Sequence, residues 1–444
     1  MISTAMKILA WKRLLPQRKE KFLTKKSFFL PLLFLLSCAA GRAGVPSVET
    51  DSLAADLSGR LVATEMEIDT SLTYCLNADV EALAFFQDNE YDGPVSKGYS
   101  VPGVWLRPRL TYIPHPQIKL ELGLHALIYD GANKYPCYAY RDIATWKGNQ
   151  YQSGSHVLPF FRAQARLGKA DVVLGNLYGG SQHGLALPLY NPELNLTADP
   201  EMGAQLRLAL PYYHLDTWID WQSYIFEQDT HQEAFSVGVV QRIRFNRKPR
   251  AWEFSVPLQV VLQHRGGEQD NTYLGVQTLV NAAAGVSVQW NVRRPTLTRM
   301  NIDIYGLEAW QQSGKLWPFD LGAAFFGSVS ADLWDALRLK GGVFHSKDFV
   351  SLYGAPFFGS CSTKTTGGRF TRMTTGYWSV EYSKTFSRRY VFGAKAEGYV
   401  SCSGDLYLPS GVEKGGVHNA FSFGLYLKIH PRFLLKNFGR SKKK

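Results

Sequence analysis

The sequence has 444 residues, of which 45% are hydrophobic and 14% aromatic, so a disordered chain is excluded. Its formal net charge of +12 lies at the two ends, because residues 1–43 carry nine basic residues and one acidic residue, and the segment from Lys436 carries five basic residues and no acidic one. The body between them has a net charge of about −1, which removes the argument for a nucleic-acid partner.

Residues 1–43 have the features of a secretory signal peptide. A basic start is followed by the ten-residue apolar run SFFLPLLFLL and then by small residues. The run is too short to span a bilayer as a helix, which needs about 20 apolar residues. The small residues allow cleavage between Ala39 and Ala43, whereas the motif LLSC allows lipidation of Cys38. Leu36 is a poor residue at that lipobox position, which favours cleavage without lipidation.

The rest of the chain alternates apolar and polar side chains with the two-residue period of a β-strand. In residues 117–129, Ile118, Leu120, Leu122 and Leu124 alternate with Lys119, Glu121, Gly123 and His125. The same pattern predicts about 16 strands, near 80–87, 103–113, 117–129, 160–167, 170–177, 203–210, 215–226, 235–245, 252–264, 273–289, 299–310, 318–331, 336–346, 376–386, 390–401 and 418–429. Several have about ten residues, the length that a tilted transmembrane strand needs.

The connections between these strands alternate in length. Short links are predicted at 114–116, 168–169, 211–214, 246–250, 332–335 and 387–389. Long links are predicted at 130–159, 178–202, 347–375 and 402–417. This sorting favours an all-β fold, an antiparallel transmembrane β-barrel with short periplasmic turns and long external loops, over a soluble sandwich. We expect an N-terminal periplasmic segment at 44–79, the barrel at 80–430 and a basic C-terminal tail at 431–444.

On this pattern the chain resembles the porin-like outer-membrane β-barrel family over residues 80–430. The resemblance implies a cell outer-membrane location, with outer-membrane lipids and lipopolysaccharide as partners and with homotrimer formation. It also implies that an external loop, here 178–203, folds into the lumen as a constriction. The chain departs from the family in its final residues, where the sequence continues past Ile429 and only Phe433 or Phe438 could replace the usual terminal aromatic residue.

Charged residues on the polar faces of the strands are predicted to line the lumen, because a charge on the lipid face would cost about 2–4 kcal/mol at the membrane midplane. The predicted pore-lining residues are Arg107, Arg109, Lys119, Glu121, Arg162, Arg166, Arg207, Arg242, Arg244, Arg338, Lys340 and Lys395. We expect a channel for passive diffusion of small polar or anionic solutes. The alternative is that opposite charges pair across strands and stabilise a plugged lumen.

Other functions have weaker signals. Ser181 and His183 in GGSQHG lie close together but miss the GxSxG motif, so an outer-membrane hydrolase is a minor alternative and no enzymatic activity is expected. The Tyr-rich segment 134–152, with Trp146, favours a surface-exposed glycan- or host-binding barrel. The five cysteines fall in no spacing suited to zinc, so neither a metal site nor a cofactor is expected.

Overall fold

The computed structural model describes residues 61, 66–131, 154–225, 231–246, 251–267, 274–292, 294–334, 336–386 and 389–439. The predicted signal peptide with Cys38, most of segment 44–79, the segment 134–152 and the end of the basic tail lie outside the described residues.

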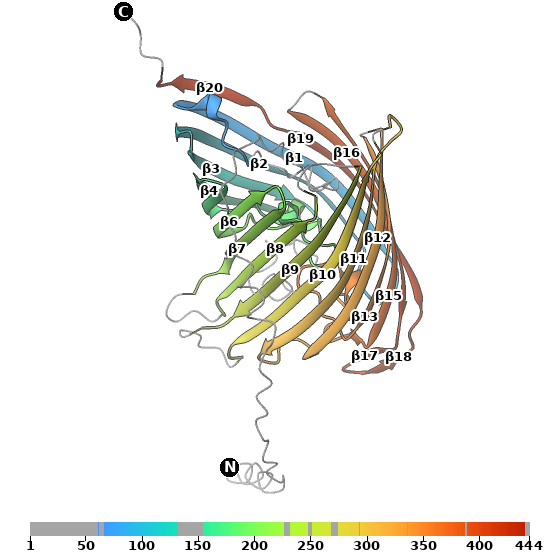
Figure 1. The fold of residues 1–444 in the computed structure, drawn as a ribbon. Helices are drawn as coiled ribbons and strands as arrows, with labels where there is room; N and C mark the ends of the chain where they lie inside the picture. The colour runs from blue at the N-terminus through green and yellow to red at the C-terminus, as the bar shows by residue number, and fades with distance from the viewer. Residues whose placement is uncertain are drawn as a thin grey trace, which may run out of the picture. The chain divides into compact units, whose positions relative to one another are not determined.

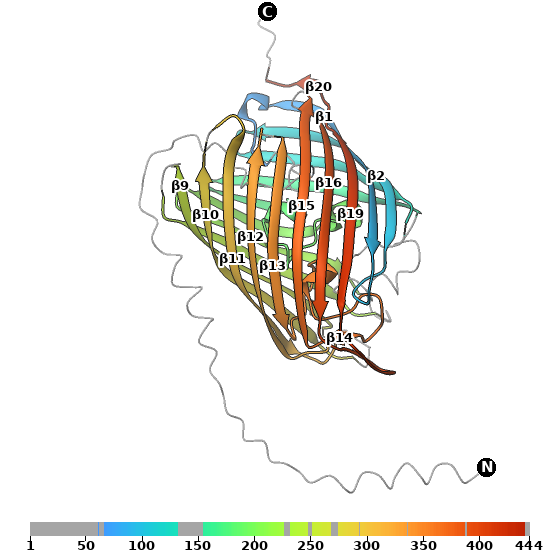
Figure 2. The ribbon, with the colours of Figure 1, turned by 90° about the vertical axis from the view of Figure 1, so that its right-hand side faces the viewer.

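An antiparallel sheet closes on itself to form a 16-strand barrel (Figures 1 and 2). Strand β1 pairs with β2 on one side and with both β19 and β20 on the other. Strands β19 and β20 therefore share one position in the barrel, and they are separated at His430 and Pro431. Proline has no backbone N–H to donate to a ladder, which accounts for the interruption.

The strands of the barrel are β1 (Cys75–Tyr91), β2 (Tyr99–His115), β3 (Ile118–Tyr129), β4 (Gly154–Leu167), β5 (Ala170–Asn176), β6 (Met202–Leu210), β7 (Tyr213–Ser223), β8 (Ala234–Arg244), β9 (Trp252–Arg265), β10 (Gln277–Asn291), β11 (Leu297–Ser313), β12 (Leu321–Leu333), β13 (Leu337–Lys347), β15 (Arg372–Phe386), β16 (Tyr390–Ser403), β19 (Val417–Ile429) and β20 (Arg432–Asn437). The predicted transmembrane barrel and its strands are confirmed. Two boundaries differ from the prediction, because β1 begins inside the segment 44–79 and β20 lies inside the predicted tail 431–444. Consecutive apolar residues at Phe433 to Leu435 conceal the two-residue period of β20.

Short turns and long loops lie at opposite rims of the barrel, here called the turn rim and the loop rim. The loops carry η3 (Gly180–His183), α4 (Leu194–Thr197), η4 (Pro356–Phe358) and a small sheet of β14 (Arg369–Phe370), β17 (Leu406–Leu408) and β18 (Gly411–Glu413), and η1 (Thr70–Leu72) precedes β1. Among the described residues, no helix is long and apolar enough to cross a membrane.

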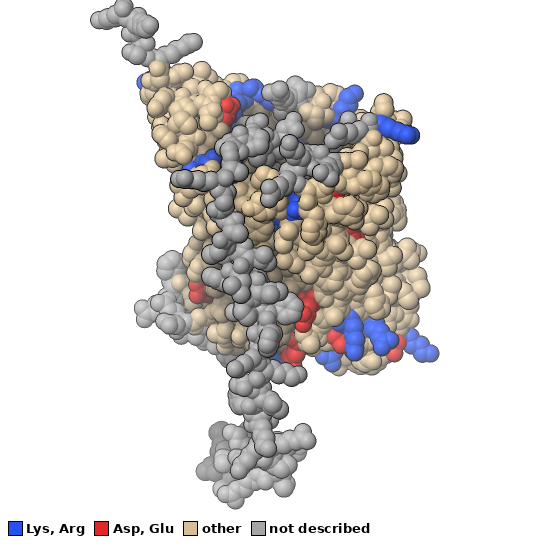
Figure 3. Space-filling view, viewed as in Figure 1, with Lys and Arg blue, Asp and Glu red and all other residues tan. Residues whose placement is uncertain are grey.

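The two faces of the strands differ in polarity as the sequence pattern predicts. On β3, Leu122 is 66% exposed on the outer wall, whereas the neighbouring Glu121 is 5% exposed and faces the interior. The space-filling view shows a largely uncharged wall with Lys, Arg, Asp and Glu gathered near the rims (Figure 3). The outer wall is therefore suited to lipid and the inner wall to polar contacts.

Two loops fold back into the lumen. Leu189, from the loop between β5 and β6, and Phe357, from the loop between β13 and β15, are buried in one cluster with the inward-facing Phe326 and Phe344. The two loops also meet directly, since Tyr190 and Tyr353 form a parallel bridge. The lumen is consequently occupied by protein at the level of these loops.

Candidate functional site

The residues predicted to line the lumen lie at inward positions of their strands. Six of them are buried, namely Arg109, Lys119, Glu121, Arg162, Arg338 and Lys395, and the other six are half-buried, namely Arg107, Arg166, Arg207, Arg242, Arg244 and Lys340. Their role in solute passage stays a prediction.

Many of these inward charges pair with one another. Arg109 contacts Glu81 at 2.8 Å and Glu121 at 2.9 Å, and Glu121 also contacts Arg162 at 3.0 Å. Lys395 contacts Glu397 at 2.7 Å. Such pairing cancels much of the positive field that an anion-selective channel would use, as the plugged-lumen alternative expects.

His183 does not form a catalytic pair with Ser181. Its two ring nitrogens lie 2.9 Å from Asp216 and 2.7 Å from Glu201, and its ring stacks on Trp218 with centroids 3.4 Å apart. Burial alone would lower the pKa of His183, but attraction by Glu201 and Asp216 raises it to about 9. The imidazolium therefore anchors the loop between β5 and β6 to the barrel wall, and it cannot act as a base at neutral pH.

The same loop places Glu193 against the barrel wall, beside the first two strands. Tyr99 donates a hydrogen bond to one carboxylate oxygen of Glu193 at 2.6 Å. Gln87 and Asn89 donate to the other oxygen at 2.9 Å and 3.3 Å. These three donors project inward from β1 and β2, because alternate residues of a strand face the same side.

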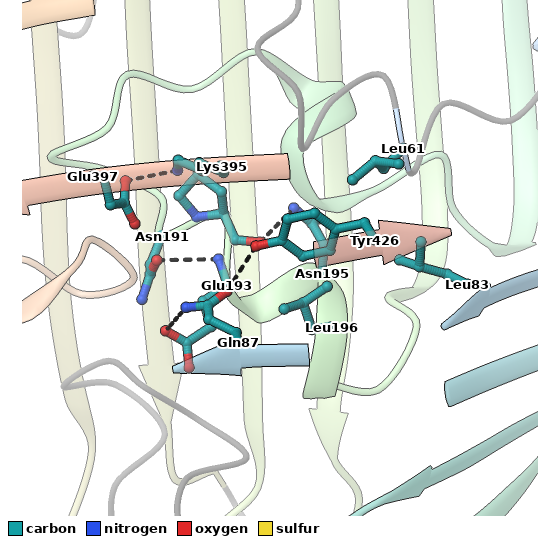
Figure 4. Close-up of a pocket in the computed structure, with 11 residues that line it drawn as sticks. Leu61, Leu83, Gln87, Asn191, Glu193, Asn195, Leu196, Lys395, Glu397 and Tyr426 are labelled. Atoms are coloured by element: carbon teal, nitrogen blue, oxygen red, sulfur yellow. Dashed lines mark hydrogen bonds and ion pairs between the residues drawn. The ribbon is translucent and has the colours of Figure 1, made fainter. Parts of the chain in front are cut away.

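Glu193 lies in a small pocket between this loop and the barrel wall, here called the Glu193 pocket (Figure 4). It is lined by Leu61, Leu83, Gln87, Asn191, Pro192, Glu193, Asn195, Leu196, Lys395, Glu397 and Tyr426. In Figure 4 the three leucines lie on one side, and Lys395, Glu397 and Asn191 on the other. The pocket is therefore amphipathic, with an apolar side next to a polar and charged side.

The pKa of the Glu193 carboxyl group is shifted towards physiological pH. Burial raises its pKa to about 7, and the nearby Glu397 adds to the rise, while the hydrogen bonds from Tyr99 and Asn89 oppose it. A buried carboxylate with a pKa near 7 can both accept and return a proton at neutral pH. This property distinguishes Glu193 from the ion-paired carboxylates elsewhere in the lumen.

The sequence analysis included Lys395 but missed Glu193. The segment 178–203 showed only loop composition, because its glycine, proline and asparagine residues carry no strand or helix period. Contacts between Glu193 and residues about 100 positions earlier in the chain create its environment, and a local pattern cannot report them.

The fold and the site together define an outer-membrane β-barrel whose lumen encloses a buried, protonatable carboxylate. A family model described as Lipid A 3'-O-deacylase-type matches residues 68–438. The chain belongs to this family. The search of curated proteins found no match to the sequence.

Several solved structures have a similar fold at low sequence identity. OpdK from Pseudomonas aeruginosa with vanillate is 9% identical, with a TM-score of 0.45, and covers 81% of this chain and 100% of its own. OccAB3 from Acinetobacter baumannii is 10% identical, with a TM-score of 0.43, covering 81% and 99%. A BenF-like porin from Pseudomonas fluorescens Pf-5 is 7% identical, with a TM-score of 0.44, covering 80% and 99%.

The family match corrects one prediction. We expected a barrel without enzymatic activity, but the family to which the chain belongs is named for a deacylase. The expectation was wrong because it relied on nucleophile motifs such as GxSxG, which a site assembled from an infolded loop and separate strands does not contain.

Proposed function

We propose that this protein is an outer-membrane hydrolase that cleaves an ester-linked acyl chain from lipid A, with Glu193 as the general base. The observation that carries the proposal is a carboxylate with a pKa of about 7 inside an amphipathic pocket, in a chain of the deacylase-type family. An ester in a lipid needs such a pocket, because its acyl chain is apolar and its carbonyl becomes negatively charged during hydrolysis.

The chemistry assigned to Glu193 is proton transfer. Tyr99 occupies one lone pair of its first carboxylate oxygen, which leaves another lone pair to accept a proton from a water molecule. The hydroxide formed attacks the ester carbonyl, the bond between the carbonyl carbon and the alcohol oxygen breaks, and Glu193 returns the proton to the departing alkoxide. The products are a free fatty acid and the deacylated alcohol.

The apolar side of the pocket offers leucine side chains that would contact the acyl part of such a substrate. Leu61, Leu83 and Leu196 belong to one buried cluster that also includes Tyr426. Lys395 supplies an N–H donor group on the polar side, where an ester oxygen would lie.

The variant Glu193→Gln tests this proposal with purified protein in detergent and lipid A as substrate. The amide keeps the size of the side chain but cannot act as a base, so we expect the rate of fatty-acid release to fall about 100- to 10,000-fold. The matched control Glu413→Gln changes an exposed residue of β18 and should leave the rate unchanged. A Glu193→Gln variant as active as the unaltered protein would rule out the proposed base.

Passive diffusion of small polar solutes is a second candidate function. It is favoured by a second cavity in the lumen, lined among others by Arg107, Arg162, Asp199 and Glu201, where charges of both signs require water. Conductance of the purified protein in a planar bilayer would test it. Discrete open-channel steps would support the channel, whereas a silent bilayer containing folded protein would exclude it.

A further inference from the structure

A cluster of four polar residues interrupts the apolar outer wall of the barrel at the loop rim. It consists of His345 and Lys347 at the end of β13 and of Arg372 and Thr374 at the start of β15. These four residues, here called the β13–β15 patch, occupy outward positions in two adjacent strands. His345, Lys347 and Arg372 are exposed and Thr374 is half-buried.

The two residues of the patch nearest the loop rim are cations that lie side by side. Lys347 and Arg372 are direct cross-strand neighbours. Like charges in this arrangement destabilise a sheet unless an anion lies between them. Among the described residues neither cation has an ion pair, and Glu308, the acidic residue in the same row, is separated from Lys347 by Ala323 of β12.

The two residues of the patch further from the loop rim add hydrogen-bonding groups. His345 Nδ1 lies 2.8 Å from the Thr374 hydroxyl, and the two residues are also cross-strand neighbours. This pair lies next to the cations on the side away from the rim, where a molecule bound by Lys347 and Arg372 would extend along the wall.

The residues around the patch indicate its depth in the membrane. The outward residues further along the same strands and their neighbours are apolar and exposed, including Phe325, Val343, Trp378 and Val400. The patch therefore lies where hydrocarbon gives way to polar headgroups, at the rim that carries the long external loops. A ligand there has its charged part beside Lys347 and Arg372 and its apolar part beside the wall.

We propose that the β13–β15 patch binds the phosphorylated headgroup of a lipid in the external leaflet. The cations neutralise phosphate, the His345–Thr374 pair hydrogen-bonds to sugar or ester oxygens, and the wall beneath contacts the acyl chains. The patch lies on the outer wall and the Glu193 pocket lies in the lumen, so this lipid-binding role does not depend on hydrolysis.

Binding of purified lipid A to the protein in detergent tests the patch. The probes are lipid A with its phosphates, the same lipid A after enzymatic removal of the phosphates, and inorganic phosphate. The double variant Lys347→Gln/Arg372→Gln should bind phosphorylated lipid A about 25-fold more weakly, because each cation near a membrane surface contributes about a five-fold change in affinity. Inorganic phosphate at the same concentration should not displace the lipid.

The matched control is Lys384→Gln/Lys436→Gln, which removes two cations near the turn rim, where each lies over an aromatic ring. This control should bind like the unaltered protein. Glu193→Gln should also bind normally even though hydrolysis is lost, which separates the patch from the proposed activity. Equal affinity of the unaltered protein for phosphorylated and dephosphorylated lipid A, or normal binding by the double variant, would overturn the proposal.

Discussion

The burial of Glu193 predicts how the rate of the proposed hydrolysis depends on pH. Because burial raises its pKa to about 7, the side chain is a neutral acid below this pH and a carboxylate above it. A general base must be ionised, so the rate of fatty-acid release should rise about ten-fold per pH unit up to about pH 7 and then level off. Initial rates between pH 5 and pH 9 would measure this, and a rate independent of pH across that range would contradict the role of Glu193.

The same residue predicts a cost in stability. Its folded-state pKa of about 7 lies above the ordinary value of 4.5, so its stabilising contribution is complete below pH 4.5 and is lost as the pH rises through 7. Glu193→Gln, which is always neutral, should therefore unfold at a higher temperature than the unaltered protein at pH 8, with little difference at pH 4. Gel mobility after heating would report unfolding of the barrel. A lower unfolding temperature for the variant at pH 8 would contradict the burial of an ionised carboxylate.

At the scale of elements, the loop between β5 and β6 depends on His183 for its position. The imidazolium holds Glu201 and Asp216 together, and its removal takes the nearest positive charge from the half-buried Glu201 and the buried Asp216. His183→Ala should release the loop from the wall, so that conductance in planar bilayers increases and deacylation falls. The control His231→Ala changes a half-buried residue of another loop and should alter neither, whereas unchanged conductance in His183→Ala would contradict the anchoring role.

The strands were predictable because each needs only a two-residue period, which is written locally in the sequence. The start of β1 follows this rule, since the inward-facing Asn77 and Asp79 alternate with apolar residues, and the predicted strand began too late. Strand β20 was harder to predict, because Phe433 to Leu435 do not alternate. The resemblance implied that the loop 178–203 folds into the lumen, but neither the infolding of the loop between β13 and β15 nor the contact of Tyr190 with Tyr353 could be predicted, since both depend on distant segments.

The candidate site likewise has features that the sequence predicted and features that it did not. Parity along the strands predicted that Lys395 and Arg162 face inward, since only the polar face of a strand can carry them in a membrane. It did not predict that Glu121 would pair with Arg162, because register across strands decides such contacts. Glu193 itself belongs to no strand, and only the folded chain reveals its surroundings.

The whole molecule is a barrel with two chemically distinct surfaces. Its outer wall presents apolar side chains to lipid, and its lumen holds paired charges and two infolded loops. The proposed hydrolysis would benefit from this arrangement, because the barrel would hold the protein in the membrane that contains the lipid while the loops shield the Glu193 pocket from bulk water.

The most direct measurement of the central claim is the mass spectrum of lipid A after incubation with the purified protein in ¹⁸O-labelled water. The account predicts lipid A lighter by one ester-linked acyl chain, together with a free fatty acid that carries one ¹⁸O atom. The Glu193→Gln variant should yield neither product. Lipid A that keeps all of its acyl chains in the presence of folded, unaltered protein would contradict the claim.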